Sequence, residues 1–90
     1  MTREEPKTGE IWKHFKNEYC KIICTGHHSE TEEKMVVYAK VKPVYEIADN
    51  IYVVAGEPCI RPLDMFMSEV DHKRYPNAKQ KYRFERVCIE

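Results

Sequence analysis

The sequence predicts a mostly β protein, folded as a small and strongly bent barrel or sheet of about five to six strands. Short segments alternate apolar and polar residues with the period of two that is typical of strands. No segment keeps a period of 3.6 residues over the length of an ordinary helix. The chain has 90 residues, which predicts a single domain over residues 1–90 with a small core.

The expected elements follow one another along the chain. Residues 1–8 are polar and contain Pro6, so we expect a flexible lead-in. At most one or two helical turns are expected in PLDMFMSEV, beginning near Pro62 or Asp64. Strands are predicted in EIWKHFK (10–16), YCKIICT (19–25), KMVVYAKV (34–41), NIYVVAG (50–56) and YRFERVCIE (82–90).

The segment 34–41 is the clearest strand. Its two faces carry Met35, Val37, Ala39 and Val41 on one side, and Lys34, Val36, Tyr38 and Lys40 on the other. We expect the lysine-bearing face to lie outside, where Tyr38 and Trp12 would form an aromatic binding platform. Alternatively, loops or the C-terminal segment cover this face. The apolar residues of 82–90 are too many for a free end, so this segment is predicted to pack on the domain.

Charge and cysteine content limit the classes of protein. The 15 basic and 15 acidic residues cancel, which argues against a dedicated polyanion binder but leaves room for a local patch. No apolar run suits a membrane span or a signal peptide, so we predict a cytoplasmic protein with no membrane partner. Cys20, Cys24, Cys59 and Cys88 are then reduced, without disulfides. Cys20 and Cys24 share strand parity and are interpreted as core residues.

The polar corner from His28 to Thr31 is the densest group of functional side chains. Ser29 and Glu32 have capping-box spacing, but the Met-Val-Val-Tyr run that follows favours a strand. The Ser29 and Thr31 hydroxyls would then bond the loop backbone. A solvated hairpin loop is the simplest interpretation.

Two chemical alternatives at this corner are weaker. His28 and Glu30 could serve a small hydrolase-type enzyme, but no nucleophile motif accompanies them. Cys24, His27 and His28, with Cys20, could bind a metal, but their spacing matches no common zinc pattern. We therefore predict no metal and no cofactor.

The C-terminal segment carries the strongest charge imbalance. From Asp71 to Arg86 the sequence has six basic and two acidic residues, and aromatic residues are interspersed among them. This composition is typical of single-stranded nucleic-acid surfaces, with Lys73, Arg74, Lys79, Lys81 and Arg83 as the candidates. The alternative is a solvated segment whose charge faces the acidic Glu30–Glu33 loop.

The motifs HFK, HSETEEKMVVY and RPLDMF, followed by Glu69, resemble the domain of unknown function 1653 family. The resemblance implies a small bacterial protein with an SH3-like barrel, and it implies no activity. Departures from the family pattern include Cys20 and Cys59, which replace the usual tyrosine and tryptophan. The matching residues are Gly9, Trp12, His14, Phe15, Lys16, His28, Ser29, Glu30, Thr31, Glu33, Val36, Val37, Tyr38, Arg61, Pro62, Met65 and Phe66.

The same resemblance pairs the Arg-Pro motif with the polar corner. Pro62 holds Arg61 extended, and a guanidinium suits a carboxylate, so we hypothesise that Glu30 or Glu33 accepts hydrogen bonds from Arg61. The function predicted is a small binding or accessory module without chemistry of its own, whose partner is a protein or a nucleic acid. Its candidate binding residues are His28, Ser29, Glu30, Thr31, Glu33, Arg61, Trp12 and Tyr38.

Overall fold

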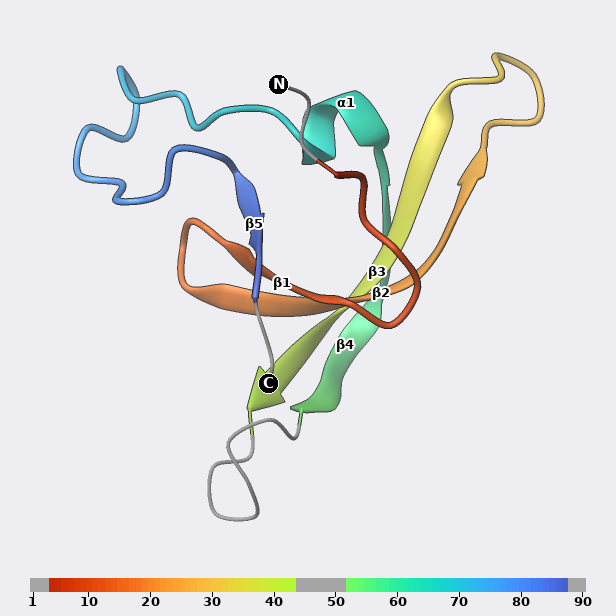
Figure 1. The fold of residues 1–90 in the computed structure, drawn as a ribbon, viewed down its shortest axis with the longest axis horizontal. Coiled ribbons are helices and arrows are strands. Elements are labelled where there is room, and N and C mark those ends of the chain that lie inside the picture. Colours follow the sequence, from red (N-terminus) through yellow and green to blue (C-terminus); the bar gives the residue numbers. More distant parts are fainter. Residues whose placement is uncertain (1–3, 44–51, 88–90) are drawn as a thin grey trace.

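The computed structural model describes residues 4–43 and 52–87. Five antiparallel strands form one sheet in the order β4-β3-β2-β1-β5, and one short helix follows β4 (Figure 1). The mostly β prediction is confirmed, and so is the single helical turn that begins directly after Pro62. The elements are β1 (Ile11–His14), β2 (Glu18–His27), β3 (Lys34–Pro43), β4 (Tyr52–Pro62), α1 (Leu63–Phe66) and β5 (Phe84–Arg86).

The sheet is open but curled. Its edge strands are β4 and β5, and no backbone pairing joins them within residues 4–43 and 52–87, so the expected barrel is not closed there. Their side chains nevertheless meet across the concave face. The guanidinium carbon of Arg61 on β4 lies 5.5 Å from the ring centroid of Phe84 on β5. The curl therefore brings residues from opposite edges of the sheet into one neighbourhood.

The concave face holds an aromatic core. Phe66 of α1 stacks on Phe84 of β5 with ring centroids 4.1 Å apart, and Tyr38 lies 5.5 Å from each ring. The prediction that Lys34, Val36, Tyr38 and Lys40 form an outer face is therefore wrong for Val36 and Tyr38, which are 0% and 5% exposed, whereas the two lysines are exposed as expected. The C-terminal segment covers this face, as the alternative interpretation had it. Trp12 is 2% exposed, so the described structure has no aromatic platform there.

A bulge divides β2 into two halves. The pairing of β2 with β3 shifts between Ile22 and Cys24, and an extra residue in one strand reverses the faces that follow it. Cys20 and Ile22 are therefore buried, whereas Cys24 is exposed, so the prediction of a core Cys24 is wrong. Cys20, Cys24 and Cys59 have free thiols, and Cys88 lies outside the described residues.

The C-terminal segment packs on the sheet through β5. His14 pairs with Phe84 and Trp12 with Arg86, which confirms the predicted packing for residues 84–86. Val87 continues this pairing by donating its N–H to the Ile11 carbonyl at 2.8 Å, and residues 88–90 of the prediction lie outside the described ranges. The connection before β5 is closed at its base by a hydrogen bond from the Arg83 N–H to the Ser68 carbonyl, at 2.9 Å. Residues 68–83 thus form a long loop beside β1 and β5 (Figure 1).

The lead-in contacts the folded part of the chain. Pro6 is buried, and the Lys7 N–H donates to Glu10 Oε1 at 2.8 Å. Burial alone would raise the pKa of Glu10, but hydrogen bonds from Lys7, Trp12 and Arg86 lower it. Within the described ranges, no helix is long and apolar enough to cross a membrane.

Candidate functional site

The polar corner forms a self-contained hairpin tip, which we define as residues 28–33. All six residues are exposed. The His28 Nδ1 accepts the N–H groups of Glu30 and Thr31 at 3.1 and 3.3 Å, and the Thr31 hydroxyl accepts the Glu33 N–H at 3.3 Å. The expected backbone bond of Thr31 is confirmed, while the imidazole of His28, rather than Ser29, supplies the other acceptor. Every one of these contacts is local to the turn.

Arg61 does not join the hairpin tip. Among the described residues, no hydrogen bond or ion pair links Arg61 to Glu30 or Glu33, so the predicted cluster is wrong. Arg61 pairs with Val36 across the β3–β4 ladder, and paired residues share a face of the sheet. Because Val36 belongs to the concave core face, the guanidinium projects toward that face, while both glutamates lie on the loop beyond the strand end.

Arg61 instead reaches a second polar region, a groove of about 290 Å³ that we call the cationic groove. Its residues come from β1, the β1–β2 turn, β4 and the long 68–83 loop, which are distant in sequence. The residues that line it are His14, Phe15, Lys16, Arg61, Asp71, Arg74, Tyr75 and Arg83.

Four cations and one carboxylate, Asp71, line this groove, so its charge is positive overall. None of Lys16, Arg61, Arg74 and Arg83 has an ion pair within residues 4–43 and 52–87. The ion pairs of the described chain use other cations, namely Lys34, Lys40, Lys81 and Arg86. The acidic residue in the groove has a structural role, as Asp71 Oδ1 accepts the N–H groups of Lys73 and Arg74 at 3.1 and 3.4 Å.

Aromatic rings and a tight turn position these cations. Arg61 lies over Phe84, while Lys16 and Arg74 lie 5.3 and 5.6 Å from the Tyr75 ring centroid. Asn17 closes the β1–β2 turn with φ of 66°, a left-handed conformation that asparagine tolerates well.

Arg83 lines the groove and also carries an unsatisfied donor. Its Nε atom is buried and has no hydrogen-bond partner among the described residues. A buried donor without an acceptor costs free energy. Because this atom has almost no accessible surface, a ligand in the groove would reach it only if the side chain moved.

His14 lines the groove with a defined tautomer. Its Nδ1 accepts the Lys16 N–H at 3.1 Å, so the neutral ring carries its proton on Nε2. Burial lowers the pKa of His14 below its ordinary value, against the opposing effect of Glu18 and with the help of Arg61 and Lys16. The imidazole is therefore neutral at pH 7 and can donate a hydrogen bond.

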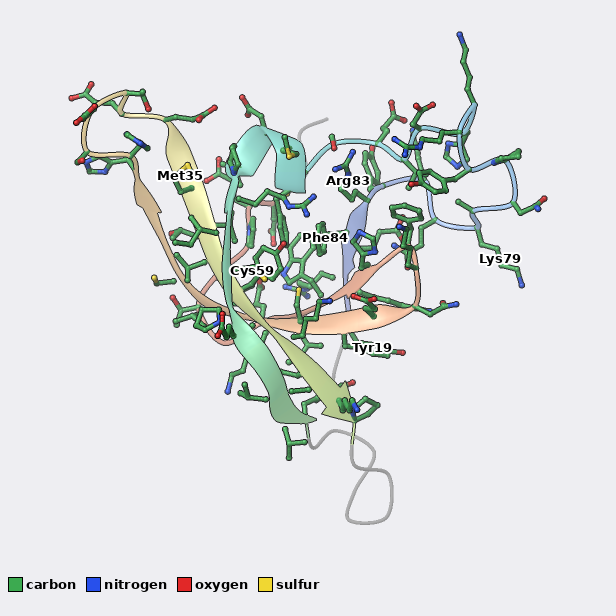
Figure 2. The ribbon with its side chains drawn as sticks, turned by 180° about the vertical axis from the view of Figure 1, so that it is seen from behind. Tyr19, Met35, Cys59, Lys79, Arg83 and Phe84 are labelled. Atoms are coloured by element: carbon green, nitrogen blue, oxygen red, sulfur yellow. The ribbon has the colours of Figure 1, made fainter. Side chains whose placement is uncertain are left out.

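A hollow of about 360 Å³ adjoins the groove and shares His14, Lys16 and Arg61 with it. We call it the neutral hollow, because its other charged residues, Glu18 and Lys40, form an ion pair at 3.3 Å. Figure 2 shows Cys59 and Phe84 facing the interior between β4 and β5. The remaining lining residues are Tyr19, Cys20, Tyr38, Cys59 and Phe84.

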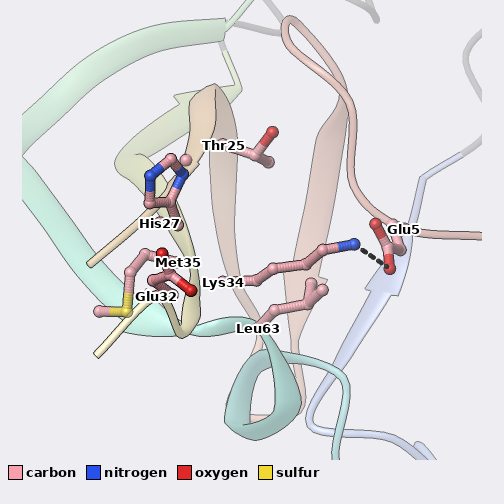
Figure 3. Close-up of a pocket in the computed structure, with 8 residues that line it drawn as sticks. Glu5, Thr25, His27, Glu32, Lys34, Met35 and Leu63 are labelled. Atoms are coloured by element: carbon pink, nitrogen blue, oxygen red, sulfur yellow. Dashed lines mark ion pairs between the residues drawn. The ribbon is translucent and has the colours of Figure 1, made fainter. Parts of the chain in front are cut away.

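A third hollow, of about 460 Å³, lies between the β2–β3 hairpin, the lead-in and α1 (Figure 3). The Lys34 side chain crosses it and pairs with Glu5 at 3.7 Å. His27, Glu32 and Met35 also line it, and its polar side chains are exposed. Its charges are mixed and its cation is paired, so it favours no ligand class as clearly as the cationic groove does.

The basic residues of the loop divide into two groups. Arg74 and Arg83 line the groove, whereas Lys73 and Lys79 are exposed, with Lys79 extending away from the sheet (Figure 2). Lys81 pairs with Glu69 at 3.9 Å. The suggestion that this charge faces the Glu30–Glu33 loop is wrong, because the two loops lie on opposite sides of the molecule (Figure 1).

The metal alternative at Cys24, His27 and His28 finds no support. Among the described residues, no three histidine, cysteine or acidic side chains are placed to hold a metal ion.

Sequence reasoning found some of the groove residues and missed others. Arg61 was predicted as a site residue with the wrong neighbours, and Arg74 and Arg83 only as part of a nucleic-acid surface. His14 and Lys16 were not proposed as site residues, although they belong to the HFK motif. This motif lies directly before a turn, and strand alternation does not explain its residues. It was therefore the signal in the sequence that could have indicated His14 and Lys16 as site residues.

Comparison with known proteins agrees with the motifs. The family model described as "Protein of unknown function (DUF1653)" matches residues 10–86, nearly the whole chain. No curated protein and no solved structure gives a significant match. The matched segment includes β1 to β5, the hairpin tip and every residue of the cationic groove. The chain therefore belongs to this family of proteins of unknown function.

Proposed function

We propose that this protein is a small binding module that holds an anionic group in the cationic groove. The observation that supports this function is the convergence of Lys16, Arg61, Arg74 and Arg83 on one groove without an ion pair among the described residues. The chain as a whole has no net charge, so this concentration of positive charge is local. Hydrogen bonds between guanidinium groups and an anion are among the stronger polar contacts in proteins.

We also propose an SH3-like architecture, a bacterial origin and a cytoplasmic location for this module. The curled sheet supports an SH3-like architecture, and the family resemblance supports a bacterial origin. The free thiols of Cys20, Cys24 and Cys59 suit a reducing compartment, so a cytoplasmic location is part of the proposal. Arg61 would act as a ligand-binding residue here and at the same time pack on Phe84.

A titration with inorganic phosphate tests the function. Amide spectra of ¹⁵N-labelled protein would be followed at constant ionic strength, with sodium chloride replaced stepwise by sodium phosphate. We expect saturable shifts at residues 14–17, 61, 71–75 and 83. Shifts that chloride reproduces, or that scatter over the surface, would overturn the proposal.

Paired variants make the test specific. Lys16→Met with Arg74→Met removes two groove cations on exposed side chains, and should weaken phosphate binding about tenfold or more. Lys73→Met with Lys79→Met removes the same charge from exposed positions outside the groove and should leave the affinity within about twofold. Equal losses in the two variants would mean that only the general charge of the loop matters.

A further inference from the structure

The cationic groove and the neutral hollow lie side by side, with His14, Lys16 and Arg61 lining both, and this adjacency indicates the kind of ligand. Resting on the proposed function, we infer that the ligand is a small phosphomonoester. Its phosphate would lie in the cationic groove and its uncharged body, of the size of a sugar or a nucleoside, in the neutral hollow. Three features carry the inference: the positive charge of the groove, the side chains that already contact its aromatic rings, and the residues that line the hollow.

The charge of the groove suits a phosphate dianion. A phosphomonoester carries about −1.5 to −2 charge at pH 7 and three acceptor oxygens. Arg61, Arg74 and Arg83 offer planar forks of donors, and Lys16 adds a compact charge. A single carboxylate would leave more of these donors unsatisfied.

The aromatic rings do not suit an extended nucleic-acid strand. Single-stranded nucleic acids are held by bases stacked on exposed rings. Tyr75 is already contacted by Lys16, Arg74 and Phe15, and Phe84 lies between Arg61 and Phe66. A base that stacked on Tyr75 would compete with these groups, and Phe84, which is 2% exposed, offers no free face. The groove therefore recognises charge rather than base faces.

The neutral hollow can accommodate the uncharged part of the ligand. Its volume of about 360 Å³ lies at the lower end of the ~300–1,000 Å³ usual for small-molecule pockets. Burial raises the pKa of Tyr38 against the smaller opposing effects of the charge of Arg61 and of its hydrogen bond to the hydroxyl, which stays protonated and keeps its own proton to donate. The Cys59 side chain adds a small, weakly polar surface. Lys16 and Arg61 also line the hollow where it adjoins the groove, while these other groups suit hydroxyls and a ring.

His14 lies where the two cavities meet. Its Nδ1 is held by the Lys16 N–H, which leaves the Nε2–H as the ring's donor. A neutral donor at this position fits the ester side of a phosphate, where charge is lowest. The imidazole would thus position the junction between phosphate and body.

Calorimetric titrations with five probes test the inference. The probes are inorganic phosphate, ribose 5-phosphate, adenosine 5′-monophosphate, adenosine and an oligothymidylate without terminal phosphate. We expect at least one of the two phosphomonoesters to bind about tenfold more tightly than inorganic phosphate, and adenosine to bind more weakly than its monophosphate. A phosphoserine peptide serves as a sixth probe for the same phosphate on a protein.

A variant that fills the neutral hollow tests the two parts of the site separately. Cys59→Phe places a ring in the neutral hollow and should remove the advantage of the phosphomonoesters while inorganic phosphate still binds. Cys24→Phe introduces the same ring on the exposed half of β2 and should change neither affinity. Amide spectra of both variants establish that they are folded.

The outcomes distinguish this inference from the proposed function. If inorganic phosphate binds in the groove but both phosphomonoesters bind no more tightly, the inference is overturned and the anion site stands. If no phosphate binds at all, the proposed function fails as well. If the oligothymidylate or the phosphoserine peptide binds more tightly than both phosphomonoesters, the inference of a small-molecule ligand is overturned. If the phosphomonoesters lose their advantage over inorganic phosphate in Cys59→Phe, the inference is supported.

Discussion

The hairpin tip and the cationic groove are both rich in polar side chains, yet they are built in opposite ways. The tip takes six consecutive residues, and its hydrogen bonds join residues at most five positions apart. The groove takes its residues from four segments, with His14 and Arg83 far apart in the sequence. Polar residues that are adjacent in sequence satisfy one another in a turn, whereas those gathered by the fold are left with unused charge. Ligand binding is therefore expected in the groove rather than at the tip.

The largest effect is expected from the ring beneath the groove. Phe84 is 2% exposed and supports Arg61, so Phe84→Ala should lower the free energy of unfolding by about 3–5 kcal/mol. Ile60→Ala removes an apolar side chain that is 67% exposed and should change stability by less than about 0.5 kcal/mol. Chemical denaturation measures both. A Phe84→Ala loss as small as that of Ile60→Ala would show that the two edges of the sheet are not held together by this ring.

The two halves of β2 should differ in thiol reactivity. Burial raises the pKa of Cys20 to about 12, so little thiolate forms at pH 8, whereas Cys24 is exposed beyond the bulge. Iodoacetamide should modify Cys24 at least about a hundredfold faster than Cys20 in the native protein. Site-resolved mass spectrometry over time gives both rates. Equal rates in native protein, with equal rates in urea as the reference, would contradict the placement of Cys20.

The tip should show a smaller and local effect. The His28 imidazole accepts two backbone N–H groups, so His28→Ala should cost about 0.5–2 kcal/mol, as the loss of a helix N-cap does. The neighbouring His27→Ala removes a ring that makes no such bonds within residues 4–43 and 52–87, and it should cost less. Phosphate affinity should stay unchanged in both variants. A loss of phosphate binding in His28→Ala would restore the tip as part of the site.

The smallest effect concerns pH. Burial lowers the pKa of His14 in the folded state below the ordinary value of 6.5, so the unfolded chain binds more protons in this range. The stabilising contribution of neutral His14 is thus complete above pH 6.5 and is lost as the pH falls through the folded pKa. His14→Asn keeps an acceptor for the Lys16 N–H and should flatten this dependence.

The measurement is the difference in unfolding free energy between wild type and His14→Asn from pH 7.5 to 5. Other titrating groups contribute equally to both proteins and cancel. If wild type gains stability relative to the variant as the pH falls, the sign of the His14 shift is reversed.

The sequence by itself determined the class of fold, the positions of most strands, the helical turn after Pro62 and the family. These features depend on local alternation, turn residues and contiguous motifs, which act within a few residues. It also indicated the polar hairpin, because the residues that satisfy one another there are neighbours.

Only the tertiary structure decided which faces are buried and which charges meet. The alternation of 34–41 defined two faces but not which one β5 and α1 would cover, and the bulge after Ile22 reversed the parity of Cys24. Arg61 was assigned to the wrong carboxylates because its direction depends on its register opposite Val36. Long-range pairing sets register and curvature, and no local pattern encodes them, so the groove exists only once the two edges of the sheet come together.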